Sequence, residues 1–220
     1  DVTGKHLHTL PHGAGIISSA AFFYQGKYCI TVSEDKIAKL WTSQGQLIDS
    51  ISHPEKINGV EVAPNDSFVV TYSQDGLVKI WNWETKVEQS FQAHLDAING
   101  VRFSSDGNYF LTFSDDQSVK VWSLMGEQLV SLGGFTGAVL EAGFSKNDQL
   151  IYASSWDNSA KIFPLIDHKV TTYPKPNEQM QTISLSREGD RILGVSFNGT
   201  GYIWEHGELE QISLKSETGW

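Results

Sequence analysis

The chain has few of the residues that crosslink a protein or attract nucleic acid. Cys29 is its one cysteine, which excludes an intrachain disulfide and favours a reducing compartment. The 16 lysine and arginine residues are outnumbered by 26 aspartate and glutamate residues, and the formal charge of −10 argues against the phosphate backbone of nucleic acids as the main partner. No apolar run approaches the roughly 20 residues of a membrane helix, and the opening residues lack the basic and apolar lead of a signal peptide. We therefore expect a cytoplasmic protein without a membrane partner.

Motifs for cofactors, metals and catalysis are also scarce. Glycine-rich phosphate loops and paired cysteines are absent, and His6, His8, His168 and His206 lack metal-ligand spacing. No set of converging carboxylates and no isolated nucleophile stands out. The sequence thus predicts no cofactor, no metal and no catalytic residue, which favours a protein that is not an enzyme.

What the sequence does contain is one pattern repeated five times. A serine and an aspartate two residues apart are followed six residues later by tryptophan, and two weaker copies lie toward the C-terminus. The copies are Ser33/Asp35/Trp41, Ser73/Asp75/Trp81, Ser114/Asp116/Trp122, Ser155/Asp157/Phe163 and Ser196/Asn198/Trp204. Apolar residues recur with the same step at Phe22, Val62, Phe103, Phe144 and Leu185. A period of about 40 residues indicates stacked supersecondary units.

Each repeat has the pattern of four short antiparallel strands. In the cleanest copy, strands are predicted over residues 97–104, 109–114, 118–123 and 128–132, separated by turn residues such as Ser105-Asp106-Gly107-Asn108. Four strands in about 41 residues is the content of one propeller blade, and a lone sheet of this size cannot bury both faces. The predicted fold class is therefore all-β, a β-propeller whose four-stranded blades stack on one another.

With these residues the chain resembles the WD-repeat family over almost its whole length. The resemblance implies a hydrogen-bonded tetrad in each blade, in which aspartate orients histidine, histidine contacts the serine hydroxyl, and serine contacts the tryptophan indole. Complete tetrads are expected at His12, Ser33, Asp35 and Trp41; at His53, Ser73, Asp75 and Trp81; and at His94, Ser114, Asp116 and Trp122. In the fourth repeat Phe135 and Phe163 replace histidine and tryptophan, and in the fifth Pro176 and Asn198 replace histidine and aspartate.

Histidine, serine and aspartate together also suggest a nucleophilic triad. Because the combination recurs at three equivalent places, it favours architecture, since an active site is normally made once. The lysines that share the period, Lys39, Lys79, Lys120 and Lys161, are expected to form a solvated row between blades.

The phase of the repeats predicts how residues 1–220 are organised as one propeller segment. Residues 1–11 are expected to be the outer strand of a preceding blade, and residues 216–220 the start of a further repeat. Five blades are expected between them, at about 12–52, 53–92, 93–133, 134–174 and 175–215. This phase favours a window of a larger propeller. A closed five-bladed ring or a self-associating adaptor is the alternative, because open blade faces promote association.

In WD-repeat proteins, the residue before the turn aspartate and two residues of the first strand often face partners. At the first position the resemblance places Glu34, Gln74, Asp115, Trp156 and Phe197. At the strand positions it places Ile16 and Ser18, Lys56 and Asn58, Ala97 and Asn99, Ala138 and Leu140, and Gln179 and Gln181.

Exposed aromatic residues are typical anchors of interfaces. We therefore predict a partner site across blades four and five, led by Trp156 and Phe197. Its other candidate residues are Leu140, Gln179, Gln181, Asp115, Asn99, Asn58 and Lys56. The alternative is that both rings fill the space of the missing tetrads and face inwards.

The resemblance implies a non-catalytic platform for protein or peptide partners. It suggests a scaffold, or a sensor module of a larger multidomain protein whose other domains are themselves partners. A propeller enzyme with a site at the channel mouth and a nucleic-acid-binding propeller are the rival classes, and no residues of this chain favour either.

Overall fold

The computed structural model describes residues 6–13, 15–165, 171–172, 178–186, 191–205 and 208–213, and the side chains of all of these except 171–172 and 208–213. In this part of the chain the regular elements are all strands. No helix in it is long and apolar enough to cross a membrane. The chain divides into two compact units, residues 1–101 and 102–220.

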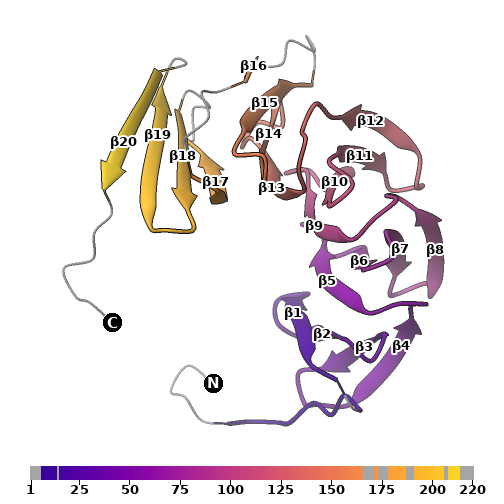
Figure 1. The fold of residues 1–220 in the computed structure, drawn as a ribbon. Helices are drawn as coiled ribbons and strands as arrows, with labels where there is room; N and C mark the ends of the chain where they lie inside the picture. The colour runs from indigo at the N-terminus through magenta and orange to yellow at the C-terminus, as the bar shows by residue number, and fades with distance from the viewer. Residues whose placement is uncertain are drawn as a thin grey trace. The chain divides into compact units, whose positions relative to one another are not determined.

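The first unit contains two four-stranded antiparallel sheets, in which each strand pairs with the next one along the chain (Figure 1). The strands of blade one are β1 Ile17–Phe23, β2 Tyr28–Ser33, β3 Ile37–Thr42 and β4 Leu47–Ser52. Those of blade two are β5 Ile57–Val62, β6 Val69–Ser73, β7 Leu77–Asn82 and β8 Val87–Gln92.

Three further sheets have the same order, and the strand that opens the first of them crosses the unit boundary. Blade three consists of β9 Ile98–Phe103, β10 Tyr109–Ser114, β11 Val119–Ser123 and β12 Gln128–Leu132. Blade four consists of β13 Val139–Phe144, β14 Leu150–Ser155, β15 Ala160–Pro164 and β16 Thr171–Thr172. Blade five consists of β17 Met180–Leu185, β18 Arg191–Ser196, β19 Thr200–Glu205 and β20 Glu208–Ser213.

The all-β class and the four-stranded blades predicted from the repeat are confirmed. Two of the strands predicted in the cleanest repeat coincide with β10 and β12. The strand predicted at β9 is one residue too long at each end, and the strand predicted at β11 begins one residue too early. The prediction that the chain is a window of a larger propeller remains a prediction.

Burial along each blade follows from stacking. Every residue of β10 is buried except the half-buried Tyr109, because both faces of this inner strand are covered. The outer strand β8 is mostly exposed. Inner strands are therefore continuous runs of apolar and small residues, whereas outer strands tolerate charge.

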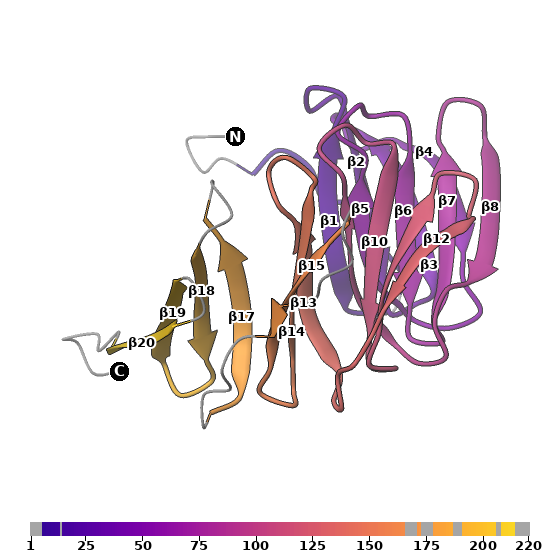
Figure 2. The ribbon, with the colours of Figure 1, turned by 90° about the horizontal axis from the view of Figure 1, so that it is seen from above.

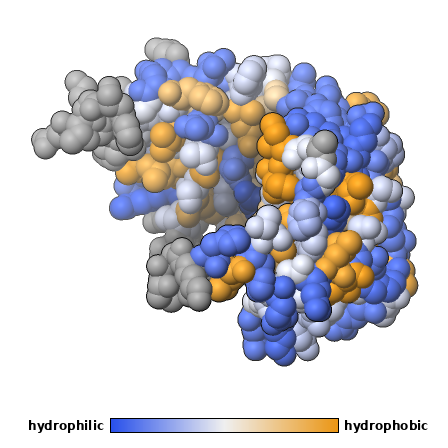
Figure 3. All heavy atoms as spheres, turned by 90° about the horizontal axis from the view of Figure 1, so that it is seen from below, coloured by the Kyte–Doolittle hydropathy of each residue, from blue (hydrophilic) through white to orange (hydrophobic). Residues whose placement is uncertain are grey.

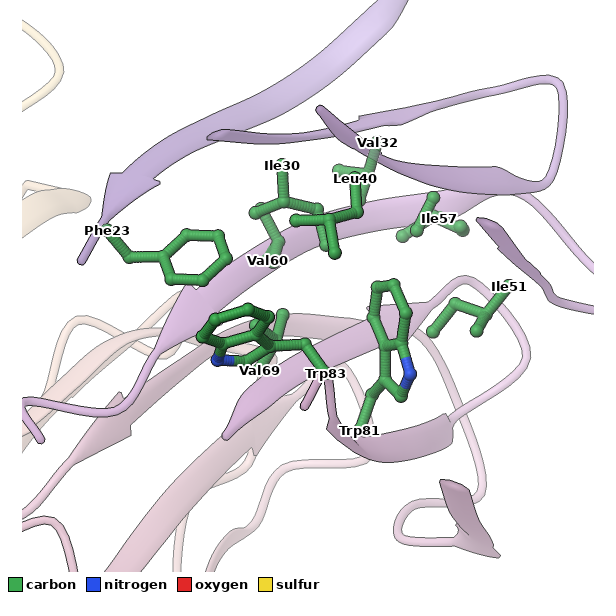
Figure 4. Packing of buried hydrophobic residues seen from close by; sticks show 11 residues of the cluster. Phe23, Ile30, Val32, Leu40, Ile51, Ile57, Val60, Val69, Trp81 and Trp83 are labelled. Atoms are coloured by element: carbon green, nitrogen blue, oxygen red, sulfur yellow. The ribbon is translucent and has the colours of Figure 1, made fainter. Parts of the chain in front are cut away.

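A single hydrophobic cluster joins blades one and two. Trp83 is 8% exposed and lies 5.3 Å, ring to ring, from Phe23 in an edge-on arrangement. Figure 4 shows its indole beside Phe23, with Trp81 turned toward Ile51. The Trp83 Nε1–H group donates a hydrogen bond of 2.7 Å to the Asp66 carbonyl oxygen, so the buried indole keeps a polar partner.

Two similar clusters hold the second unit together. One contains Leu111 and Val121 of blade three with Val139 and Ile151 of blade four. The other joins blade four to blade five, where β17 lies beside β13 and β14 (Figure 2). Both clusters lie between sheets, so the core of the second unit is divided into layers.

Trp83→Ala is expected to lower the free energy of unfolding by about 3–5 kcal/mol, because it leaves a cavity in the cluster between blades one and two. Val87→Ala in the same unit is the matched control, since Val87 is 56% exposed, and its effect should stay within about 0.5 kcal/mol. Urea denaturation followed by tryptophan fluorescence and circular dichroism measures both values. Equal effects of the two substitutions would contradict this description of the cluster.

Candidate interaction surface

The Ser-x-Asp pattern forms the turn between the second and third strands of every blade. The carboxylate of Asp35 accepts the N–H of Ile37 at 3.0 Å, and that of Asp157 accepts the N–H of Ser159 at 2.8 Å. Asn198 does the same in blade five, where its side-chain oxygen accepts the N–H of Thr200 at 3.2 Å. An amide oxygen thus closes the turn as a carboxylate does, which explains the asparagine of the fifth copy.

The residue after the aspartate always has a left-handed backbone. Its φ is 69° at Lys36, 79° at Gly76, 70° at Gln117, 67° at Asn158 and 83° at Gly199. Glycine occupies this position in two of the five blades, as expected where φ is positive. The turn therefore has one backbone shape throughout the chain and holds the preceding residue in a fixed place.

Inside blade one the polar groups form a chain of hydrogen bonds. The Trp41 Nε1–H donates to Thr31 Oγ1 at 2.8 Å, Thr31 Oγ1 lies 2.6 Å from His12 Nε2, and His12 Nδ1 lies 3.2 Å from Asp35 Oδ2. One assignment satisfies all three contacts: the threonine hydroxyl donates to Nε2, and the Nδ1–H donates to the carboxylate. His12 and Thr31 are both buried.

The expectation that serine contacts the tryptophan indole is wrong in blades one and three, where threonine accepts that bond. Trp41 pairs with Cys29 across the strands. Thr31 lies two residues further along β2, about 7 Å away, whereas Ser33 lies about 13 Å away, beyond the reach of an indole. Ser33 Oγ instead accepts the N–H of Asp35 at 3.1 Å and so belongs to the turn.

Blades two and three repeat the arrangement with small changes. His53 Nε2 lies 2.8 Å from Thr71 Oγ1, and its Nδ1 lies 3.1 Å from Ser73 Oγ, which donates to Asp75 Oδ1 at 2.6 Å. Serine here lies between the histidine and the aspartate. In blade three Trp122 Nε1–H donates to Thr112 Oγ1 at 2.8 Å, and Ser114 Oγ accepts the N–H of Asp116 at 3.0 Å. His94 is buried at 1% exposure.

Blade four replaces the histidine, threonine and tryptophan of the polar chain with apolar groups and keeps Asp157 in the turn. Phe135 and Phe163 are both buried and pack edge to face with ring centres 6.0 Å apart. At the threonine position stands Ala153, which is fully buried in the same cluster. The three substitutions fit together, because a threonine hydroxyl between two phenyl rings would have no partner in the positions that the histidine and tryptophan occupy elsewhere.

In blade five the space of the polar chain is filled by a third set of side chains. Gly194 stands at the threonine position, and a Cβ there would lie 2.1 Å from the Met180 side chain, which fills the space. Glu178 accepts hydrogen bonds from Ser196 Oγ at 3.0 Å and from Tyr202 OH at 2.8 Å. Hydrogen bonds from Asn198 and Tyr202 lower the pKa of the Glu178 carboxyl. Pro176, expected at the histidine position, lies outside the described residues.

The lysine row is not simply solvated, contrary to the prediction. Lys39 Nζ donates to the Pro11 carbonyl oxygen at 3.0 Å, and Lys161 Nζ donates to the carbonyl oxygen at the equivalent Gly134. Lys161 is buried and its ammonium group lies 4.6 Å from the centre of the Phe135 ring. These lysines tie the segment before the histidine position to the third strand.

The backbone brings the two sets of predicted partner positions together in each of four blades. The residue before the turn aspartate donates its N–H to the carbonyl oxygen at the first strand position. These bonds are Glu34 to Ile16 at 3.0 Å, Gln74 to Lys56 at 3.0 Å, Trp156 to Ala138 at 2.9 Å and Phe197 to Gln179 at 3.1 Å. We call these positions, with the second strand position, the rim of each blade.

The aromatic rim residues of blades four and five face solvent. Trp156 is 53% and Phe197 58% exposed. The space left by the missing tetrads is filled by Phe135 and Phe163 in one blade and by Met180 in the other. Gln179 and Gln181 are exposed and Leu140 is half-buried. On the face drawn in Figure 3, apolar residues gather in patches between hydrophilic ones.

Several of the other rim residues form hydrogen bonds or ion pairs within the chain. Ser18 Oγ donates to the Ile57 carbonyl oxygen at 2.6 Å, and Asn58 Nδ2 donates to the Ile98 carbonyl oxygen at 3.0 Å. The second strand position therefore hydrogen-bonds to the first strand of the next blade. Lys56 forms an ion pair of 3.3 Å with Glu34. Asp115 and Asn99 are exposed.

One rim assignment is wrong. Ala97 is only 3% exposed. Its methyl side chain is too short to extend past its neighbours, so this position offers no surface to a partner.

Among the described side chains, no cluster of three or more histidine, cysteine, aspartate or glutamate residues could hold a metal ion. Grooves among the described residues include one on the face of the first blade, one on the face of the last blade and one at Tyr24 and Asp66. The rim of blades four and five carries exposed side chains on turns of one backbone shape.

The stacked four-stranded sheets with a common turn define a propeller-type repeat protein. The family model of the WD domain, G-beta repeat, matches residues 4–42, 45–82, 85–123 and 126–163, and the chain belongs to this family. No curated protein matches the sequence. WD domains generally mediate contacts between proteins and are generally non-catalytic, so the chain is a protein-interaction module of this type.

Thr31→Val is expected to lower the free energy of unfolding by about 1–3 kcal/mol, because the buried Trp41 indole loses its acceptor and His12 its partner hydroxyl. Thr42→Val is the matched control, since the Thr42 hydroxyl accepts an exposed N–H, that of Gln46. Ala153→Thr should be destabilising in turn, because its hydroxyl would be buried beside phenyl rings. Urea titration measures all three. A neutral Thr31→Val would show that threonine is not the acceptor that matters.

His53 is expected to make folding depend on pH. Burial, and then the charge of Lys79, lower its pKa from 6.5 to about 4, while Asp75 opposes the shift. As pH falls from about 6.5 to 4, the unfolded chain binds a proton that the folded chain does not. The stabilisation that neutral His53 contributes is therefore fully present above pH 6.5. It is lost as the pH falls to about 4, by roughly 3 kcal/mol in total. Urea titration from pH 7 to 4 should show a shallower loss for His53→Gln. Parallel curves for both proteins would rule the effect out.

Proposed function

We propose that the chain binds protein or peptide partners through the rim of blades four and five. The observation that supports this most directly is that Trp156 and Phe197 are more than half exposed. Large rings held at a surface bring much contact area with little loss of side-chain freedom, and tryptophan is enriched in binding hot spots. The alternative in which both rings face inwards loses its rationale, because other side chains fill the tetrad space.

The proposed site is rigid before a partner arrives. Trp156 and Phe197 both lie in turns closed by an Asp or Asn side chain and are tied by their own N–H groups to the first strand. A fixed backbone lowers the entropic cost of binding. The exposed amides of Gln179 and Gln181 lie on the same blade as Phe197 and can hydrogen-bond to a peptide backbone. A partner segment with a large apolar side chain and neighbouring free amide groups fits this chemistry.

We further propose that the module is cytoplasmic and acts as the scaffold or sensor part of a larger multidomain protein. The chain has one cysteine, Cys29, and therefore no intrachain disulfide, as suits a reducing compartment. A scaffold and a sensor differ in whether partner binding changes the assembly of the whole protein.

Peptides selected from a displayed random library on the immobilised chain provide the test. Trp156→Ala and Phe197→Ala should each weaken binding of the selected peptides at least tenfold, with unchanged cooperative unfolding. Leu129→Ala is the matched control, because Leu129 is 54% exposed but lies on the outer strand β12. Binders that tolerate both ring substitutions would place the site elsewhere. Loss of cooperative unfolding in either variant would return the rings to a structural role.

A further inference from the structure

The boundary between blades four and five is apolar at a position where the boundaries of the first unit are polar. Ser18 and Asn58 each donate a hydrogen bond to the carbonyl oxygen of the residue that opens the first strand of the next blade. Blade four has Leu140 at the equivalent position, and a leucine side chain has no donor. Leu140 is half-buried. By this equivalence it adds an apolar side chain where the blade of Trp156 meets the blade of Phe197.

Trp156 is open although another blade packs against its own. It is 53% exposed, while β17 of blade five lies beside β13 and β14. Its indole N–H donates to none of the described residues, whereas the indoles of Trp41 and Trp122 donate inside their blades. Trp156 therefore presents to solvent both an apolar ring and a hydrogen-bond donor that no described residue uses.

Blade five adds further donors beside its own ring. The side-chain amides of Gln179 and Gln181 are exposed and form no hydrogen bond with a described residue. The Gln179 carbonyl oxygen accepts the N–H of Phe197 at 3.1 Å, so this glutamine is tied to the ring's own turn. Each glutamine amide carries two N–H donors. The surface therefore combines two rings with donors for carbonyl oxygens, which suits a partner whose backbone carbonyl groups are not already paired.

The spacing of the two rings selects among the backbone conformations of a partner. Trp156 and Phe197 occupy equivalent positions of neighbouring sheets, and packed sheets lie about 10 Å apart. In polyproline II every third side chain returns to the same edge, about 9 Å further along the segment. In a β-strand the side chains of one face are about 7 or 14 Å apart. Polyproline II therefore matches the spacing, and an extended strand does not.

An α-helix matches the spacing but not the donors. Side chains seven residues apart on one helix face are separated by about 10.5 Å. The backbone N–H and C=O groups inside a helix are bonded to one another, so they offer no acceptor to the Trp156 indole or to the glutamine amides. Polyproline II has no internal hydrogen bonds and leaves its carbonyl oxygens available.

We propose that the rim of blades four and five binds a proline-rich segment in the polyproline II conformation. The inference rests on the partner site proposed above and names the class of its partner. Apolar side chains three residues apart lie on Trp156 and Phe197, with Leu140 beneath the residues between them. The Trp156 indole and the amides of Gln179 and Gln181 donate to carbonyl oxygens of the segment. Aromatic side chains are the usual surface for such segments, whose preformed shape lowers the entropic cost of binding.

Fluorescence anisotropy of labelled synthetic peptides tests the proposal. A peptide built from the repeat Leu-Pro-Pro should bind, because all its leucines lie on one edge. A peptide built from Leu-Pro-Pro-Pro keeps the conformation but winds its leucines around the axis, and it should bind at least tenfold more weakly. An alanine-rich helical peptide with leucines seven residues apart should bind no better than this control. Equal binding of the two proline peptides, or a preference for the helical peptide, would overturn the proposal.

Variants of the rim test which side chains the proline peptide contacts. Trp156→Ala should weaken its binding at least tenfold, and Trp156→Phe several-fold, because the phenyl ring lacks the indole donor. Leu140→Asn should also weaken binding, although asparagine stands at this position in blade two. Leu129→Ala and Leu47→Ala are the matched controls, because both leucines are 54% exposed on the outer strands β12 and β4. Thermal unfolding shows that each variant is folded, and binding unchanged in folded Trp156→Ala would contradict the proposal.

The peptides selected from the displayed library separate this proposal from the partner site on which it rests. Selected peptides that need both rings and carry prolines between apolar residues three apart support both. Selected peptides that need both rings but lack proline would overturn the polyproline II segment and keep the partner site. Selected peptides that tolerate both ring substitutions would remove the site and this inference together.

Discussion

The stacking of thin sheets is the constraint on which the other features depend. A four-stranded sheet is a single layer with two apolar faces. Its inner strands are therefore shielded from water only when neighbouring sheets pack against them. Ile30 and Leu111 are fully buried for this reason, and their equivalent Leu193 is 44% exposed where the same face is open. Because the core lies between the sheets, a change inside one blade is felt at its boundary with the next. The turns that extend beyond this core are free to vary, and they carry the candidate binding residues.

The polar chain within a blade changes at several positions together. In blade one a threonine hydroxyl serves both the indole of Trp41 and the imidazole of His12. Removing one member would leave buried donors or acceptors without partners, which is worse than an apolar filling. Blade four accordingly changes three positions together, to Phe135, Ala153 and Phe163. Blade five exchanges the threonine for Gly194 and fills the space with Met180, while Glu178 gathers the hydroxyls of Ser196 and Tyr202.

The repeat in the sequence was enough to predict the blades and most of their strands, because the period reports the stacked unit directly. The role of Thr31 was harder to predict, since threonine is common in strands and an acceptor two residues before the serine has no motif of its own. Its signal was present as a column, Thr31, Thr71 and Thr112, that ends at Ala153 together with the histidine and tryptophan. The sequence left two orientations of Trp156 open, because a turn residue lies outside the alternation that assigns strand residues to a face. Ala97 was misassigned because its position fits the family pattern, although its side chain does not extend past its neighbours.

Two kinds of exposed apolar side chain must be distinguished in this chain. Phe22 and Leu193 lie within strands, at positions equivalent to Val62 and Leu111, which other blades of this chain cover more deeply. Trp156 and Phe197 lie in turns, at positions held by Glu34, Gln74 and Asp115 elsewhere, so no packing rule of the chain explains them. The first kind matches the chemistry of another blade, because a blade already fills the equivalent place. The second kind has no such match within the chain, and it is therefore the better candidate for a partner of different structure.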